Sequence, residues 1–533
     1  MRKENLALFG VIGLGLILRL FVLAQRGSFW FDEAFAVHFS SMDIPRMLSY
    51  LRFENNPSLY FIILHFWMKL FGNSELVVRM LSMIFGVAAI PLIYLIGVRL
   101  GGVASESSRK IERGLSAATP NSTGRTIGLF AAFLLAIATF QVFYSTETRM
   151  YTMYLFLALL GMLLFLSEKK RRVPLFFVLL LMVWTHITAW MIVAALCGYL
   201  LWQSHFSVKQ VIIHNAKFIS IVALLALSFL PWAINFVQLK IAAPLSQGYL
   251  FHIPPDKNFF LSILENFLVF GQDNAFIITL LSAIIVVLLW FAVREIRRQG
   301  LRSSGGLASP HALLLCWLFV PLFIGFAFQN AIPRYFIAVA PALYLLMGIG
   351  FAQLVDIRNQ SLLVARPQRK VVWPLPLLVT ILTFALIFPD YPSLIKIGHH
   401  EWDKLAEWVQ DQDSMTTGQQ DNKTIILINP HSEILPFERY YQGRLPVIGF
   451  YPKDDDLDRD MRIVRTNWVS LNTKENVSRL ADITKEYNQV FLVTGGIDPV
   501  GRNLVPVWFW ENGWRRGESQ EFGKMSVMVL ERL

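Results

Sequence analysis

Cysteine is almost absent from this sequence. The 533 residues include two cysteines, Cys197 and Cys316, and each stands inside an apolar run. Two cysteines cannot build the set of several bridges that holds small secreted domains together. A disulfide-rich fold is therefore excluded.

Charged residues are also scarce. They make up 16% of the chain, whereas soluble domains average about 25%, and 55% of the residues are hydrophobic. The scarcity is confined to residues 1–390, where long apolar runs dominate, while 391–533 has the composition of a soluble domain. We therefore expect an α-helical polytopic membrane domain over 1–390 and a small α/β domain over 391–533.

The net charge of +11 does not indicate a nucleic-acid partner. The lysines and arginines stand in short clusters between apolar runs. This is how membrane proteins set their orientation, whereas a nucleic-acid interface gathers its basic residues on one face. The partners we expect are membrane lipid and lipid-linked molecules.

Apolar runs long enough to span a membrane recur along the first 390 residues. A spanning helix needs roughly 20 apolar residues. The first run, 6–24, has no small-residue cleavage site after it and is interpreted as a retained span, not a signal peptide. We predict about eleven spans, near 6–25, 76–98, 127–143, 151–167, 173–187, 189–203, 216–234, 275–293, 311–328, 335–354 and 372–389.

The basic clusters predict the orientation of these spans. If the spans alternate, the clusters around 2–3, 99–125, 169–172, 294–302 and 366–370 fall on one side, which is then cytoplasmic. The 391–533 domain would lie outside the cell membrane, together with a first outer loop over 26–75. Within that loop the apolar run 59–71 is too short to span and predicts a helix lying on the membrane.

The last 143 residues mix two patterns. Residues 402–410 have helical spacing, and 424–428, 490–494 and 525–530 are strand-like. Together they predict the small α/β domain.

Four spots on the predicted outer side carry charged residues at the membrane boundary. They contain Asp32 and Glu33, then Glu54, then Glu147 with Arg149, and finally Arg334. Ordinary explanations exist for each: acids cap helices, polar turns precede proline, and arginine snorkels. Arginine on the outer side nevertheless runs against the positive-inside bias.

Together these residues fit one chemistry. A sugar linked to phosphate carries its own leaving group, so a single carboxylate suffices to take a proton from an acceptor hydroxyl. Arginines can stabilise the phosphate as its charge grows. A lipid carrier would deliver that phosphate at the membrane surface.

Five motifs in order resemble a known family over roughly residues 1–390. The first is the predicted first outer loop, with Phe-Asp-Glu at 31–33, Asn-Pro-Ser-Leu-Tyr at 56–60, Leu-His-Phe-Trp at 64–67 and Leu-Phe-Gly-Asn-Ser-Glu-Leu-Val-Val-Arg at 70–79. The others are Tyr-Ser-Thr-Glu-Thr-Arg-Met-Tyr at 144–151, Trp-Thr-His at 184–186, Phe-Leu-Pro-Trp at 229–232, and Arg-Tyr at 334–335 with Pro341. This order resembles the GT-C class of polyprenyl-phosphate-sugar glycosyltransferases, in particular bacterial protein-mannosyltransferase-like and aminoarabinose-transferase-like enzymes.

The resemblance implies an inverting glycosyltransferase that uses a polyprenyl-phosphate sugar donor and a protein, lipid or glycan acceptor. It implies that Asp32 is the catalytic base and Glu33 its supporting neighbour. It also implies a set of substrate-binding residues, which comprises Glu54, Glu147, Arg149, Tyr151, Arg334, Tyr335, His65 and His186.

Some questions stay open at this point. Relatives often have Pro-Pro where this chain has Pro57-Ser58, and Gln-Glu where it has Thr146-Glu147, which affects the substrate but not the class. A transporter or flippase of lipid-linked sugars and a lipid-linked glycan polymerase or ligase are the alternatives. No cofactor is required by this chemistry, and the spacing of the acids leaves a divalent metal open.

Overall fold

The structure is a computed structural model. It describes residues 3–109, 121–167, 172–242, 255, 257–271, 273–301, 309–364, 375–416, 423–450, 458–466, 474–495 and 504–533. Most of the basic residues predicted to face the cytoplasm in 169–172 and 366–370 lie outside these ranges. The chain divides into a helical unit (Met1–Ala24, Arg79–Pro231 and Ile253–Ile397) and a second unit (Gln25–Val78, Trp232–His252 and Gly398–Leu533).

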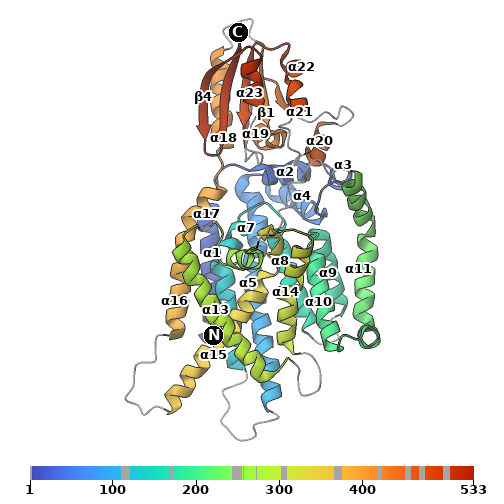
Figure 1. Cartoon of the computed structure of the whole chain (residues 1–533), viewed down its shortest axis with the longest axis vertical. Coiled ribbons are helices and arrows are strands. Elements are labelled where there is room, and N and C mark those ends of the chain that lie inside the picture. Colours follow the sequence, from blue (N-terminus) through green and yellow to red (C-terminus); the bar gives the residue numbers. More distant parts are fainter. Residues whose placement is uncertain are drawn as a thin grey trace. The chain divides into compact units, whose positions relative to one another are not determined.

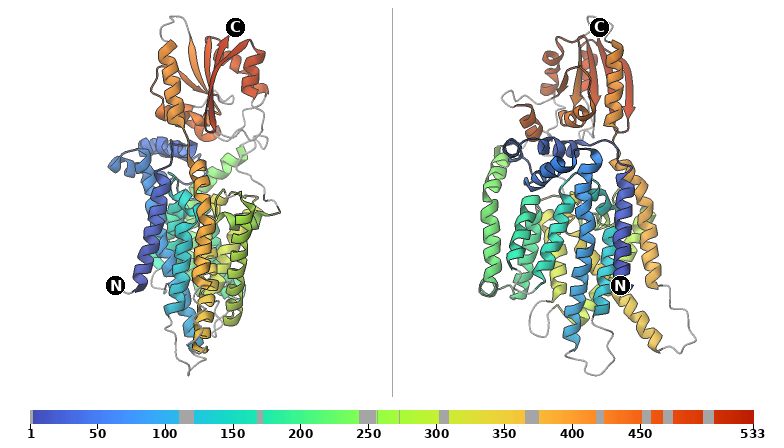
Figure 2. Two further views of the ribbon diagram at one scale, coloured as in Figure 1. Left: turned by 90° about the vertical axis from the view of Figure 1, so that its left-hand side faces the viewer. Right: turned by 180° about the vertical axis from the view of Figure 1, so that it is seen from behind.

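The helical unit consists of helices that run side by side (Figures 1 and 2). Two of its helices, α5 and α11, also contribute residues to the second unit. Its elements are α1 (Lys3–Leu23), α5 (Glu75–Arg109), α6 (Asn121–Ile137), α7 (Thr139–Ser145), α8 (Tyr151–Phe165), α9 (Arg172–Thr185), α10 (Ala189–Gln203), α11 (Val208–Ala242), α12 (Phe259–Asn266), α13 (Ala275–Gln299), α14 (Pro310–Ala327), η2 (Pro333–Phe336), α15 (Ala340–Val364), α16 (Leu375–Ile387), η3 (Phe388–Asp390) and α17 (Tyr391–Gly398).

Each of the eleven predicted spans overlaps at least one helix, and the third, 127–143, covers parts of the two helices α6 and α7. Six helices among the described residues are long and apolar enough to cross a membrane, and seven if the bent pair α6 and α7 is one span. The runs at 151–167, 173–187 and 189–203 form shorter apolar helices. The tenth run begins later than expected, because residues 333–336 form a 3-10 turn before α15. The chain is a multi-pass membrane protein.

Glycine brings α6 into backbone contact with its neighbours. A Cβ on Gly128 of α6 would lie 2.3 Å from the carbonyl oxygen of Tyr94 in α5. A Cβ on Gly348 of α15 would lie 2.6 Å from the carbonyl oxygen of Ile127 in α6. Such small-residue contacts are how membrane helices approach closely without a hydrophobic driving force.

A break separates α6 from α7, which are bent by 60°. Ala138 leaves the helical conformation at this point, with φ −57° and ψ 121°. The break frees carbonyl oxygens at the end of α6. The buried Arg19 of α1 donates to those of Leu135 (3.2 Å) and Ala136 (3.0 Å), and its Nε donates to Ser145 Oγ (3.0 Å). Arg19 therefore ties the first helix to both sides of the break.

The second unit contains residues 25–78, which include the predicted first outer loop, and the C-terminal domain. Residues 59–71, predicted as an interfacial helix, form α4 with these same bounds. The elements are α2 (Phe31–Ser41), α3 (Ile44–Leu51), α4 (Leu59–Phe71), α18 (Trp402–Thr416), β1 (Thr424–Asn429), η4 (His431–Glu433), α19 (Ile434–Tyr440), β2 (Val447–Gly449), α20 (Arg459–Thr466), α21 (Lys474–Ser478), α22 (Leu480–Thr484), β3 (Gln489–Thr494), α23 (Leu504–Glu511), β4 (Trp514–Phe522) and β5 (Met525–Arg532).

The five strands form one mixed sheet in the order β2-β1-β3-β5-β4. Strand β1 is parallel to β2 and β3, whereas β5 is antiparallel to β3 and β4. The predicted strands β1, β3 and β5 are confirmed, as is the helix at 402–410 within α18. The edge strands β2 and β4 were not predicted.

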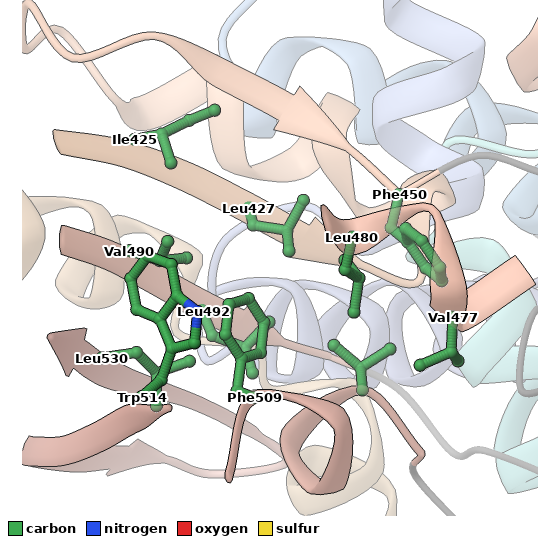
Figure 3. Packing of buried hydrophobic residues seen from close by; sticks show 11 residues of the cluster. Ile425, Leu427, Phe450, Val477, Leu480, Val490, Leu492, Phe509, Trp514 and Leu530 are labelled. Carbon is green, nitrogen blue, oxygen red and sulfur yellow. The ribbon is translucent and has the colours of Figure 1, made fainter. Parts of the chain in front are cut away.

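The core of the C-terminal domain lies on one face of this sheet. Val490 and Leu492 of β3 point into it together with Phe509 of α23 and Trp514 of β4 (Figure 3). On the other face Phe491 meets Trp408 of α18, with ring centroids 6.5 Å apart. Helices therefore cover both faces of the sheet, which is why β1 is buried at every residue.

Candidate active site

The ten predicted site residues are divided between the two units. The helical unit holds Glu147, Arg149, Tyr151, His186, Arg334 and Tyr335. The second unit holds Asp32, Glu33, Glu54 and His65.

In the helical unit, Glu147 and Arg149 stand in the turn between α7 and α8. Their side chains are buried, at 2% and 4% exposure, so Arg149 does not snorkel toward solvent. The turn is fixed to α5, because the Ser82 hydroxyl donates to the carbonyl oxygen of Arg149 (2.9 Å) and the Thr152 hydroxyl donates to that of Ser82 (2.7 Å). Arg149 is thus a buried cation on a well-anchored turn.

His186 stands in the turn between α9 and α10 and is completely buried. Its ring stacks on Tyr154 with centroids 5.3 Å apart and planes 8° apart. The rings of Tyr335 and Tyr151 lie 5.4 and 5.7 Å from it, centroid to centroid. Three tyrosines therefore fix the position of the imidazole.

Arg334 belongs to the short turn η2 and is half-buried. Its guanidinium carbon lies 6.0 Å from the ring centroid of Tyr151 and 5.8 Å from that of Tyr335, within the range of cation–π contacts. The positive charges of Arg149 and Arg334 both act on the His186 imidazole.

The helical unit thus brings four of its six predicted residues close to a fifth, His186. We call this set, Arg149, Tyr151, His186, Arg334 and Tyr335, the cationic cluster. Two guanidiniums and aromatic rings in a partly dry setting favour an anion with several acceptor oxygens. The sixth residue, Glu147, shares the turn with Arg149, whose amide donates to the carbonyl oxygen of Glu147 (2.8 Å).

In the second unit, Asp32 and Glu33 occupy the first turn of α2. Neither is the N-cap residue, which is Trp30 and makes no side-chain cap. Both carboxylates are buried, at 3% and 0% exposure. The helix N-terminus stabilises negative charge there, but burial of two adjacent acids goes beyond what capping explains.

The other two predicted residues in this unit have different surroundings. His65 of α4 is buried, and its Nδ1 lies 2.9 Å from the carbonyl oxygen of Ser40 in α2. That contact joins α4 to α2. A structural role for His65 therefore explains its burial. Glu54, after α3, is also buried, at 8% exposure.

A carboxyl group that was not among the predicted site residues lies near Asp32, that of Glu433. Glu433 ends the turn η4, after β1, and is half-buried. Burial and the negative charge of Asp32 raise the pKa of Glu433 to about 8, so this carboxyl keeps its proton at neutral pH. Its one sequence signal was its place just after the carboxyl end of a parallel strand, where functional residues of α/β domains gather.

Among the described residues, no three His, Cys, Asp or Glu side chains are grouped as metal ligands. Asp32, Glu33, Glu54 and His65, which the sequence left open as ligands, form no such group there.

No family model matches this sequence, and no curated protein matches it. Among solved structures, the chain is similar to the crystal structures of ArnT from Cupriavidus metallidurans in the apo state (TM-score 0.56) and bound to undecaprenyl phosphate (TM-score 0.54). Each match has 13% sequence identity and covers 97% of both chains. The chain therefore has the GT-C fold of ArnT, as the sequence motifs led us to expect.

Proposed function

We propose that this protein is an inverting glycosyltransferase that moves a hexose or pentose from a polyprenyl-phosphate donor to an acceptor hydroxyl. The observation that carries the proposal is the cationic cluster. A membrane protein rarely buries charge without using it, and this cluster offers two guanidiniums to one anion among tyrosines. A phosphate on a lipid carrier fits both the charge and the apolar surroundings.

The fold supports the same donor class. A neighbour in fold, ArnT, has been crystallised with undecaprenyl phosphate, which is the phosphate that a polyprenyl-phosphate sugar leaves behind. The similarity extends over 97% of both chains. It leaves the sugar and the acceptor open, whether protein, lipid or glycan.

In the proposed reaction Asp32 takes the proton of the acceptor hydroxyl. The acceptor oxygen forms a bond to the anomeric carbon, and the bond from that carbon to the phosphate oxygen breaks. The electron pair stays with the phosphate, whose growing charge Arg149 and Arg334 stabilise. Direct attack by one nucleophile inverts the anomeric centre, and no covalent enzyme intermediate is needed.

The other acids support this scheme. Glu33 and Glu54 assist Asp32 or contact the substrate, and Glu147 supports the turn that carries Arg149. Glu433 keeps its proton at neutral pH, so the carboxyl beside Asp32 carries no charge there.

The test is a transfer assay in nanodiscs with a panel of radiolabelled polyprenyl-phosphate sugars. We expect wild type to consume one donor and to release polyprenyl phosphate, and NMR of the product to show an inverted anomeric centre. Movement of label across the bilayer without release of sugar would replace the proposal by a flippase. Products of increasing length would indicate a polymerase or ligase.

We also propose that the protein lies in the cell membrane with the C-terminal domain outside the cell. Basic residues that directly follow predicted spans on the proposed cytoplasmic side, such as Arg99 of α5 and Arg294 of α13, support this orientation. Ser519 lies in the exposed part of β4. In intact cells Ser519→Cys should react with a membrane-impermeant maleimide, and protection until lysis would reverse the orientation.

Metal independence is a further part of the proposal. Transfer should persist in EDTA, because the leaving group is a phosphate already held by arginine. Loss of activity that is restored by a divalent ion would show that the acids near Asp32 hold a metal.

A further inference from the structure

The segment that leads into α2, the helix of Asp32, is hydrogen-bonded to the C-terminal domain within the second unit. The backbone N–H of Trp402 donates to Ser28 Oγ (2.7 Å). The Tyr440 hydroxyl, at the end of α19, accepts from the backbone N–H of Phe29 (2.8 Å). These bonds fix the residues that directly precede α2, and they thereby fix the position of Asp32 relative to this domain.

Glu433 is placed by the same helix α19. It ends η4 and directly precedes α19, which packs against α2. Gly495, the residue after β3, leaves room for its side chain, because a Cβ on Gly495 would lie 3.2 Å from Glu433 Cγ. The fold therefore brings together two carboxyl groups from distant parts of the chain, and the negative charge of Asp32 acts on Glu433.

Other titratable groups lie in η4 and in the elements packed against it. The strands β1 and β2 carry none. Glu438 of α19 forms an ion pair with Arg459 of α20. Burial and the negative charge of Asp32 are what raise the pKa of Glu433 to about 8. The groups on η4, α2, α19 and α20 other than Asp32 and Glu433 include Glu33, His431, Glu438, Arg439, Arg459, Asp460 and Arg462.

The proposed reaction leaves a proton on Asp32, which must lose it before the next turnover. Asp32 is 3% exposed, whereas Glu433 is half-buried and therefore closer to water. Once Asp32 is neutral, the negative charge that favoured the protonated form of Glu433 is gone, so Glu433 releases its proton more readily. The two carboxyls thus titrate as a coupled pair, whose more exposed member exchanges protons with solvent.

We propose that Glu433 carries the proton of Asp32 to solvent after each sugar transfer. The O–H bond of Glu433 breaks and its proton goes to water. The O–H bond of Asp32 then breaks as a new O–H bond forms on Glu433, which returns the pair to its starting state without any redox change. This inference rests on the proposed function, and it gives the C-terminal domain a part in the reaction.

The experiment compares the first turnover with later turnovers of the full-length protein in nanodiscs. The substrate is the radiolabelled polyprenyl-phosphate sugar that wild type consumes in the transfer assay, with the same acceptor. Glu433→Gln keeps the size of the side chain but removes the carboxyl, and Glu433→Asp keeps a carboxyl. Glu407→Gln is the matched control, since Glu407 is an exposed glutamate of α18.

The first turnover of Glu433→Gln should be as fast as that of wild type, because Asp32 begins it as a carboxylate. Later turnovers should be about 10²-fold slower, the lower end of what a positioned proton-transfer group contributes. Imidazole buffer should restore them, since it carries protons itself. Glu433→Asp should lose less than Glu433→Gln, and Glu407→Gln should match wild type in both phases.

Each other outcome has a separate meaning. If later turnovers of Glu433→Gln are as fast as those of wild type, or if imidazole does not restore them, this inference is wrong and the proposed function stands. A first turnover that is slowed as much as the later ones would show a structural role and would also overturn the inference. If wild type transfers sugar from no donor, the proposed function itself is wrong.

A second measurement covers the case in which the Glu433 variants fail to fold. Carbon-13 NMR of protein labelled at the glutamate carboxyl carbons follows the titration of Glu433 in wild type and in Asp32→Asn. The pKa of about 8 should fall in Asp32→Asn, because the neighbouring negative charge is removed. An unchanged pKa would show that the two carboxyls are not coupled and would overturn the inference.

Discussion

The two units of this chain bury different sets of charged residues. Among the described residues the helical unit buries three arginines, Arg19, Arg79 and Arg149, together with three carboxylates. The described part of the second unit buries three carboxylates, those of Asp32, Glu33 and Glu54, and no arginine or lysine. Among the described residues, the helical unit thus buries arginines and acids in equal number, and the second unit buries acids alone.

The two units also differ in the side chains that they expose. In the helical unit large apolar side chains face outward, among them Ile17 (64% exposed) and Val286 (64%). In the C-terminal domain the apolar side chains of β1 are all buried, and the exposed strand β4 is charged. Burying a charge therefore costs free energy for different reasons in the two units. In the helical unit the protein interior and the surrounding lipid are both apolar, whereas in the second unit only the protein interior is.

The comparison is tested most strongly at Asp32. If this carboxylate is the proton acceptor, Asp32→Asn should lower kcat about 10²- to 10⁴-fold, the usual contribution of general-base catalysis. The measurement is the transfer rate with saturating donor, and donor binding should stay near wild type.

Asp403→Asn is the control for Asp32→Asn, because Asp403 is an exposed aspartate in the first turn of α18. It should leave the rate unchanged. Near-normal turnover by Asp32→Asn would contradict this role. Asp32 would then only stabilise the N-terminus of α2, and the second unit would not supply the proton acceptor.

The packing of the C-terminal domain should respond to a single core truncation. Phe509 is fully buried against Trp514, with ring centroids 5.3 Å apart. Phe509→Ala should lower the free energy of unfolding of this domain by about 3–5 kcal/mol, as large-to-small core changes do. Denaturation followed by tryptophan fluorescence measures it, with Val507→Ala as the control because Val507 is 38% exposed. An equal loss for both variants would contradict the assigned core.

The anion-binding role of the helical unit is tested at its two arginines. Arg149→Ala and Arg334→Ala should each raise the donor KM about 10- to 100-fold, because each removes a charge-assisted hydrogen bond to phosphate. Arg334→Lys should lose less than Arg334→Ala, since it keeps the charge but not the planar fork.

The control for the arginine variants is Arg297→Ala, which removes an exposed arginine in the last turn of α13. Its donor KM should equal that of wild type. If all three alanine variants raise KM alike, the effect comes from overall charge and not from the cationic cluster.

The smallest expected effect concerns Glu433. Its raised pKa should make the free energy of unfolding depend on pH. Its folded pKa of about 8 lies above the ordinary value of 4.5. Between these values the unfolded chain loses the proton first, so the free energy of unfolding should fall as the pH rises from 4.5 to 8. Allowing for partial exposure, the fall should be roughly 1–3 kcal/mol.

Glu433→Gln should remove this dependence, since an amide does not titrate in that window. Unfolding of the full chain at pH 5.5 and pH 8.5 measures the difference, and the variant should gain stability relative to wild type at the higher pH. Parallel curves for wild type and variant would mean that Glu433 is ionised in the folded protein and that Asp32 does not act on it.

Much of the fold could be predicted from the sequence because long apolar runs and strand-like runs carry their own signal. The helix at 59–71 and the strands β1, β3 and β5 were found in this way. The edge strands could not be found, since β2 has three residues and β4 is almost entirely polar and forms only through pairing with β5. The break at Ala138 left no trace either, because neither proline nor glycine marks it.

The candidate site was predictable in its residues but not in their surroundings. Motif order led to Asp32, Arg149 and Arg334, and the fold of the chain agrees with the class that those motifs suggest. The neighbours of these residues depend on contacts between distant segments. Glu433 is 401 positions after Asp32, and the Thr188 hydroxyl donates to the carbonyl oxygen of Tyr335, a residue 147 positions further along the chain. The assignments of the site residues themselves stay predictions.

Arg19 has a consequence for how the protein is made. When the first helix enters the membrane, the groups that receive its guanidinium, at Leu135, Ala136 and Ser145, have not yet been synthesised. An arginine at the centre of a membrane helix costs about 2.5–3.5 kcal/mol during insertion, and Arg19 lies near the end of α1, where the cost is smaller. The first helix can therefore enter the bilayer before α6 and α7 supply the hydrogen-bond acceptors of its arginine.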